Sequence, residues 1–141
     1  MAQAEDHEAQ SQIPQPVVDG DSRPYWEGVA HGELLIQRCE ACGRAVFYPR
    51  SVCPHCSADR LGWERASGHG TVYSYTVVHQ AYGPFAGQTP FVVALVDLDE
   101  GVRMLTRLKG GPEVAQIGVR VRVVFEQVDE ELSLPYFAVV E

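Results

Sequence analysis

The stretch Cys39-Glu40-Ala41-Cys42-Gly43 is followed, after a further run, by Cys53-Pro54-His55-Cys56, and together they hold all four cysteines of the chain. Each C-x-x-C pair can form a tight turn that points both sulfur atoms into one site. Gly43 gives the first turn a permissive backbone, so that nearby amides can face the thiolates. Two such turns joined by a short hairpin complete a tetrahedron of thiolates, the geometry that zinc prefers in a closed structural site. The ligands of this predicted zinc site are Cys39, Cys42, Cys53 and Cys56.

Other uses of the cysteines fit the spacing less well. A disulfide within C-x-x-C is strained and is usually redox-active rather than structural. A thioredoxin-like centre has one C-x-x-C beside a βαβ pattern, not two in a hairpin. Iron in a rubredoxin-like site is a closer rival, because four thiolates suit both metals, but rubredoxin-like proteins carry a longer insert between their pairs. We expect His55 to be a solvent-facing turn residue and not a ligand.

The charge pattern argues against a nucleic-acid partner. The net charge is −8, and five of the nineteen acidic residues precede Arg23, the first basic residue. From Arg23 onward, fourteen acids stand against eleven bases, a balance of −3. No basic stripe that could neutralise phosphates is present. We also expect no membrane span and no signal peptide, because there is no run of 18 apolar residues and no basic n-region followed by an apolar h-region. Because its cysteines are confined to a metal-spaced cluster, we expect a cytoplasmic protein.

The first half of the chain predicts a small helix and a zinc ribbon. Residues 1–21 are polar and acidic, and we expect a flexible tail. Residues 23–32 predict a short helix that Ser22 caps and Gly32 ends. Its apolar face consists of Tyr25, Trp26, Val29 and Ala30. This face could pack on the zinc ribbon or meet a partner subunit, since aromatic residues are enriched in interface cores. Residues 33–38, 45–48 and 61–66 predict the three strands of the ribbon.

The second half alternates with period two and predicts a barrel. Its expected strands are residues 71–79, 91–98, 102–108, 119–126 and 134–140. A Gly/Pro loop covers residues 80–90, and residues 113–118 form at most one helical turn. Five strands with a break after the third are typical of an OB-fold Greek-key barrel, with an open sandwich as the alternative. The fold class is therefore mainly β. The predicted units are the tail 1–21, the helix and zinc ribbon 22–66, and the OB-fold domain 67–141.

No catalytic constellation is evident in the sequence. The motifs G-x-S-x-G, P-loop and G-x-G-x-x-G are absent, and the thiols are assigned to the metal. We therefore predict no catalytic residue and no cofactor-binding residue beyond the metal ligands. Tyr82 and Phe85, in the Gly/Pro loop, lie where barrels of this type bind ligands or partners. A modest basic patch could bind the phosphates of a ligand such as coenzyme A, although outward-facing polar strand residues are the simpler interpretation. Its members would be Arg103, Arg107, Arg120 and Arg122.

Taken together, these motifs resemble the family known as domain of unknown function thirty-five, which joins a zinc ribbon to an OB fold. The resemblance runs from Tyr25 to Phe137, about four-fifths of the chain. Its most specific element is Ser67-Gly68-x-Gly70-x-Val72-Tyr73-Ser74 beside the two cysteine pairs. Further matches are Tyr25-Trp26, Gly32-x-Leu34, Tyr48-Pro49-Arg50, Thr76-Val77-Val78-His79, Leu98-x-Glu100-Gly101, Ile117-Gly118 and Pro135-x-Phe137.

The resemblance implies a non-catalytic accessory subunit. Members of the family associate with thiolase-fold enzymes, including condensing acyltransferases and retro-aldolases of steroid side-chain breakdown, or with hot-dog-fold hydratases of acyl-CoA metabolism. The partner then supplies the catalytic residues, and an acyl-CoA ester lies at the interface. Two alternatives remain: a nucleic-acid-binding module of ribbon plus barrel, and an electron-transfer protein with iron on its four cysteines.

Overall fold

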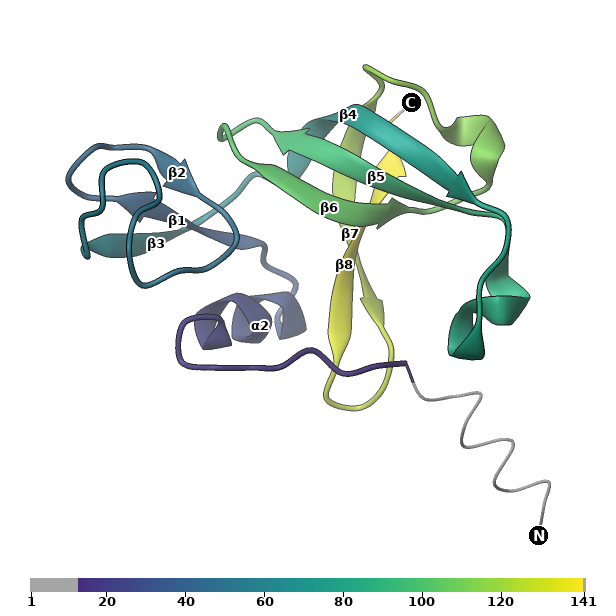
Figure 1. Ribbon diagram of the computed structural model, residues 1–141, viewed down its shortest axis with the longest axis horizontal. Helices are drawn as coiled ribbons and strands as arrows, with labels where there is room; N and C mark the ends of the chain where they lie inside the picture. The colour runs from purple at the N-terminus through teal and green to yellow at the C-terminus, as the bar shows by residue number, and fades with distance from the viewer. Residues whose placement is uncertain (1–12, 141) are drawn as a thin grey trace, which may run out of the picture.

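The computed structural model describes residues 13–140, which form a ribbon, a short helix and a barrel (Figure 1). Residues 1–12, most of the predicted tail, lie outside this part. Helix α2 (Arg23–Ala30) precedes strands β1 (Leu35–Cys39), β2 (Ala45–Val46) and β3 (Leu61–Arg65). The three strands form one antiparallel sheet in the order β2-β1-β3. The predicted helix and ribbon are therefore confirmed, with a return strand that is shorter than expected.

The start of α2 differs from the prediction in one respect. Ser22 occupies the N-cap position but makes no side-chain bond to the helix. Its Oγ instead accepts a hydrogen bond from Asp19 N, and its own N–H donates to the carboxylate of Asp19. These two bonds close a turn just before the helix. Ala30, expected on the buried face, is exposed because α2 buries the side that carries Tyr25 and Val29.

The second half forms a closed barrel with strand order β4-β5-β6-β8-β7. The strands are β4 (His69–Val78), β5 (Phe91–Leu98), β6 (Arg103–Leu108), β7 (Arg120–Gln127) and β8 (Ser133–Val139). Alternate residues of β5 are buried, as the period-two pattern predicts. Two short 3₁₀ helices, η1 (Gly83–Gln88) and η2 (Pro112–Val114), occupy the connections before β5 and before β7. The predicted five-stranded OB-fold barrel is confirmed, and the open sandwich is not.

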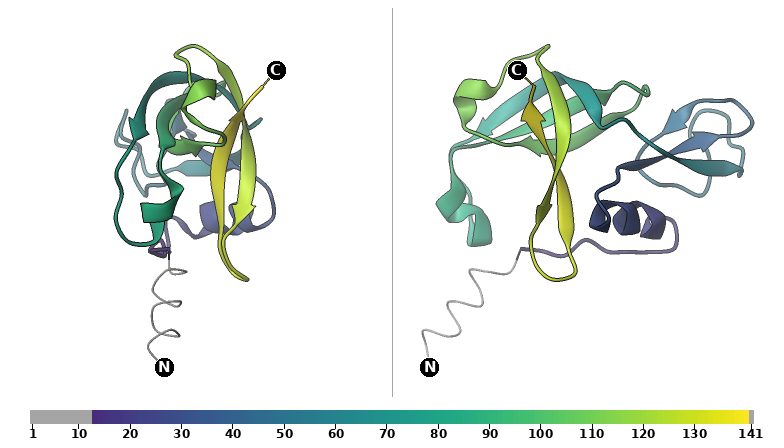
Figure 2. Two further views of the ribbon diagram at one scale, coloured as in Figure 1. Left: turned by 90° about the vertical axis from the view of Figure 1, so that its right-hand side faces the viewer. Right: turned by 180° about the vertical axis from the view of Figure 1, so that it is seen from behind.

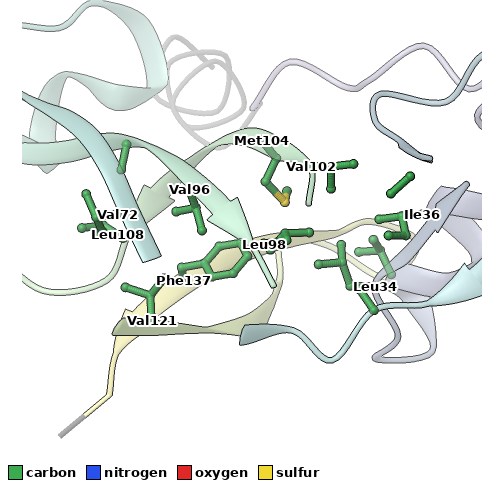
Figure 3. Close-up of a cluster of buried hydrophobic side chains, with 14 of the residues drawn as sticks. Leu34, Ile36, Val72, Val96, Leu98, Val102, Met104, Leu108, Val121 and Phe137 are labelled. Carbon is green, nitrogen blue, oxygen red and sulfur yellow. The ribbon is translucent and has the colours of Figure 1, made fainter. Parts of the chain in front are cut away.

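One hydrophobic core joins the ribbon side to the barrel. In Figure 3, Leu34 and Ile36 lie at one end, Leu98 lies between, and Val121 and Phe137 lie inside the barrel. Tyr25 and Val29 of α2 belong to the same buried cluster. Figure 2 shows the β7–β8 hairpin extending past the barrel toward α2, and α2 contacts β8. The ribbon half therefore buries apolar area against the barrel as well as within itself. The domain boundary between residues 66 and 67 stays a prediction.

Within residues 13–140, neither α2 nor any other helix is long and apolar enough to cross a membrane.

Candidate metal centre and aromatic cavity

The four cysteine sulfur atoms converge at the end of the ribbon. All four lie within 4.8 Å of one another. The Cys39 and Cys56 sulfurs are 3.5 Å apart, and the Cys42 and Cys53 sulfurs are 3.8 Å apart. A regular tetrahedron with zinc–sulfur bonds of about 2.3 Å has edges of about 3.8 Å. The donor set and its spacing therefore fit a zinc ion, and the predicted residues are brought together.

Each cysteine pair sits in a turn that aims backbone amides at sulfur. Cys42 N–H donates to the sulfur of Cys39, and His55 N–H donates to the sulfur of Cys53, both at 3.4 Å. The first turn is closed by Gly43 N–H on the carbonyl of Cys39. Gly43 has φ of +79°, a left-handed conformation that glycine adopts without strain. Amides that point at sulfur stabilise the thiolate form that a metal requires.

The thiols differ in acidity because of these contacts. The amide of Cys42, with a smaller contribution from Ala41, lowers the pKa of Cys39 to about 6. For Cys56, the amide of Ala58 acts in the same direction, but the neighbouring thiol of Cys39 and desolvation outweigh it and raise the pKa to about 11. At a pH between these two values, and with no metal bound, the close pair Cys39–Cys56 therefore carries one proton in total and one negative charge. A cation in the site would displace that proton, since metals bind thiolates.

His55 lies in the second turn and is exposed, as expected. Its Nδ1 is 3.4 Å from a guanidinium nitrogen of Arg44. It does not belong to the group of potential metal ligands in the described chain.

A buried glutamine supports the ribbon, and sequence reasoning missed it. Gln37 on β1 is only 4% exposed. Its side-chain amide exchanges two hydrogen bonds with the backbone of Arg50, at 2.9 and 2.8 Å. The run between the two cysteine turns is therefore tied to the central strand. In the sequence, Gln37 directly follows three apolar residues of the expected strand, and this position was the one signal that its side chain could be buried.

A cavity of about 610 Å³ opens between α2, the ribbon and the barrel. Its lining is almost entirely apolar and is contributed by Tyr25, Trp26, Phe47, Tyr48, Phe85, Phe91, Val93, Met104, Leu105, Thr106, Arg107, Leu134, Pro135 and Tyr136. Tyr25 anchors the aromatic wall, with its ring centroid 4.9 Å from that of Trp26 and 5.6 Å from that of Phe47. The helix face thus packs on the ribbon through Tyr25, as one of the two interpretations predicts, and lines a cavity through Trp26. Contact of this face with a partner subunit stays a prediction.

Arg107 separates this cavity from a smaller, polar hollow of about 300 Å³. Its guanidinium carbon lies 4.2 Å from the ring centroid of Phe91 and 5.8 Å from that of Tyr136. One of its nitrogens donates to the side chain of Gln88 at 2.5 Å. Lys109, on the same side, pairs with Glu126. The aromatic faces hold the guanidinium by cation–π attraction at the junction.

The other predicted binding residues are only partly assembled. Phe85 lines the cavity, but Tyr82 is 78% exposed and does not. Arg103 pairs with Asp97, and Arg120 pairs with Asp99. Both carboxylates neutralise the positive charge of the proposed basic patch. Arg107 lines the cavity, whereas Arg122 lies opposite His69 where β7 pairs with β4, so the structure does not gather the four arginines into one phosphate site.

Comparison with known proteins agrees with this architecture. The rubredoxin-like zinc ribbon domain of ChsH2 matches residues 26–62, and the C-terminal OB-fold domain of ChsH2 matches residues 63–126. A solved structure titled "Ltp2-ChsH2(DUF35) aldolase" is similar with a TM-score of 0.80 and 39% identity. The similarity covers 89% of this chain and 98% of that chain.

Three curated relatives carry different names. The "Probable enoyl-CoA hydratase alpha subunit" of Thermomonospora curvata is 40% identical over 88% of this chain, which spans only 39% of that protein. A "DUF35 domain-containing scaffold protein" of Methanocaldococcus jannaschii is 38% identical, with 75% of this chain and 77% of that one covered. The "Benzoylsuccinyl-CoA thiolase subunit BbsA" of Thauera aromatica is 31% identical, with 53% and 51% covered.

Both domains of ChsH2 are thus matched in order, around a four-cysteine site and a five-stranded barrel. The chain belongs to the DUF35 family of proteins that join a rubredoxin-like zinc ribbon to an OB-fold domain.

Proposed function

We propose that this chain is a non-catalytic accessory subunit of a thiolase-superfamily enzyme, either a thiolase, an acyltransferase or a steroid side-chain retro-aldolase. The observation that carries the proposal is the similarity to the Ltp2-ChsH2(DUF35) aldolase structure over nearly the whole of that chain. The name of the thiolase subunit BbsA supports the same class of partner. In this role the chain supports assembly of the enzyme or binding of its acyl-CoA substrate at the interface.

The chemistry of the described residues supports a role without catalysis. Among residues 13–140, no histidine side chain is hydrogen-bonded to a carboxylate or to a hydroxyl group. The four thiols converge on one site, where a zinc ion would engage all of them as ligands. A catalytic base needs a neighbour that orients it and a substrate within reach. The scaffold name of the Methanocaldococcus relative agrees with this proposal.

We assign the four cysteines as ligands of a structural zinc ion. A zinc ion with four thiolate ligands has no open position for a substrate or for an activated water. Its contribution would be to the folding of the ribbon. Thiolate ligands also suit a reducing compartment, which supports the cytoplasm as the location.

A second candidate partner is a hot-dog-fold enoyl-CoA hydratase. The hydratase name of the Thermomonospora relative favours it. Because this chain spans only 39% of that protein, the hydratase activity belongs to a larger unit.

Purification of the tagged chain from its source, followed by native mass spectrometry of the complex, tests the proposal. We expect a thiolase-like enzyme in a fixed ratio, and one zinc ion per copy of this chain. The enzyme should turn over its CoA ester only when this chain is present, and the isolated chain should have no activity. A hydratase in the complex would support the second candidate. A chain purified alone, or with nucleic acid, would contradict both candidates.

A further inference from the structure

The barrel seam between β6 and β8 has a single ladder pair and one side-chain link, from the hydroxyl of Thr106 to the carbonyl of Pro135 at 3.1 Å. These parallel strands share a single residue pair, Leu108 with Phe137, next to a bond from Lys109 N–H to the carbonyl of Phe137. Before that pair, both strands contribute to the wall of the aromatic cavity. Figure 1 shows β6 along the edge of the β4–β5–β6 layer, with β8 crossing at a steep angle. Before Thr106 the two strands share no residue pair, and the edge of β6 at Leu105 borders the cavity.

The backbone of Leu105 is directed away from β5 at this edge. In an antiparallel ladder, residues alternate between those bonded to the partner strand and those whose N–H and C=O point away from it. Leu98 N–H donates to the carbonyl of Val102. From this pair onward, every second residue pair between β5 and β6 belongs to the hydrogen-bonded series, and the pairs between them form the alternate series. Leu105, opposite Leu95, falls in the alternate series. Within residues 13–140, the register of β6 with β8 gives Leu105 no partner residue on β8.

The side chains beside this edge are apolar, with one unneutralised cation. Leu105 is 67% exposed and lines both the aromatic cavity and a shallow hollow on the outer face of the barrel. Arg107 makes no ion pair with a carboxylate in the described chain, unlike Arg103 and Lys109. An occupant that satisfies the whole site must offer backbone hydrogen bonds, large apolar side chains and one anion. An extended peptide has this chemistry, whereas an acyl chain does not supply the hydrogen bonds.

We propose that the edge of β6 takes an extended, apolar segment of the partner enzyme as an added β-strand, with a carboxylate of that segment on Arg107. The inference rests on the proposed function, because it places part of that partner's interface.

Two occupants that this chain itself could supply, its residues 1–12 and a second copy, fit the site less well. Residues 1–12 carry Glu5, Asp6 and Glu8 and no large apolar residue apart from Met1. A second copy that paired antiparallel about Leu105 would place Arg103 of one chain opposite Arg107 of the other. Because Asp97 already binds Arg103 within its own chain, this pairing would give Arg107 a neighbouring arginine and no free carboxylate. A carboxylate from the enzyme meets Arg107 without this conflict.

The test uses the complex with the co-purified partner and a photo-crosslinking residue, p-benzoylphenylalanine, at Leu105. Ile117, 66% exposed and outside the cavity, carries the same residue in the control. We expect a crosslink from position 105 to one contiguous segment of the partner that contains apolar residues and an Asp, a Glu or the C-terminal carboxylate. The Leu105 amide should also exchange its hydrogen at least tenfold more slowly in the complex than in the free chain.

Two substitutions at one residue separate the backbone from the side chain. Leu105→Pro removes the outward N–H without removing a bond to β5, whereas Leu105→Ala keeps the N–H. We expect Leu105→Pro to bind the partner about tenfold more weakly than Leu105→Ala, because hydrogen bonds to the added strand are lost.

The outcomes distinguish the inference from the proposed function. If a partner co-purifies but position 105 crosslinks to residues 1–12, to a second copy or to nothing, the inference is overturned and the accessory role stands. Equal binding by the two variants, or a small apolar molecule found in the cavity, overturns it as well. If no partner co-purifies, the proposed function fails and the inference fails with it.

Discussion

Gln37 on the central strand of the ribbon holds the backbone of Arg50 by two hydrogen bonds, one donated and one accepted. We predict that Gln37→Ala lowers the free energy of unfolding by about 1–3 kcal/mol, because two part-buried backbone groups of Arg50 lose their partner and a buried side chain is truncated. Urea unfolding of the zinc-loaded protein measures it. Gln15→Ala is the control, since Gln15 makes an exposed bond to Asp129 and its loss should cost about 0.5 kcal/mol or less. Equal effects of the two substitutions would show that the Gln37 hydrogen bonds contribute nothing to the free energy of unfolding.

The zinc assignment predicts that either of two substitutions removes the metal and unfolds the ribbon. Cys39→Ser and Cys56→Ser each remove one thiolate from the group of four. Structural zinc contributes about 10–16 kcal/mol of binding free energy that is also folding free energy, so a partial site should not remain folded. Metal analysis should give about one zinc per chain for the native protein and almost none for the variants.

His55→Ala is the matched control for the zinc experiment, because His55 lies in the same turn but outside the group of potential ligands. It should retain its zinc and its melting temperature. Iron in protein from the natural source, with an absorbance that bleaches on reduction, would contradict the zinc assignment.

Local features could be predicted from the sequence better than contacts between residues that lie far apart in the chain. The cysteine site could be predicted because each C-x-x-C turn is closed within a few residues, and the barrel strands because alternation is a local pattern. The cavity could not be predicted in this way. Its wall joins residues from α2, from the run after β2, from η1 and β5, and from β6 and β8. Only the packing of the ribbon against the barrel brings these segments together. Phe85 was singled out for its loop, yet its neighbours in the cavity come from elsewhere in the chain.

The burial of the Tyr25 phenol predicts that the protein loses stability at alkaline pH. Burial, with a smaller effect of Tyr48, raises the pKa of Tyr25 well above its ordinary value. The folded state therefore favours the protonated phenol. This contribution is complete below the unfolded pKa of about 10 and is lost as the pH rises toward the folded pKa. We expect the difference in absorbance at 295 nm between the native protein and Tyr25→Phe to show no ionisation until the fold melts. A tyrosine that ionises near pH 10 in the folded protein, and disappears in Tyr25→Phe, would contradict this.

Gly70 lies where three strands of the barrel meet, and a side chain has no space there. It pairs with Leu98 on β5 and with Val121 on β7. A Cβ at this position would lie 2.6 Å from the carbonyl oxygen of Asp97 and 2.7 Å from a methyl group of Val96. Because the obstructing oxygen is backbone in a hydrogen-bonded ladder, we predict that Gly70→Ala costs about 1–3 kcal/mol of unfolding free energy. Gly87→Ala is the control, because a Cβ there meets nothing within 4 Å, and its effect should be within about 0.5 kcal/mol or slightly stabilising. Equal stability of the two variants in urea would mean that β4 and β5 can separate at this point without cost.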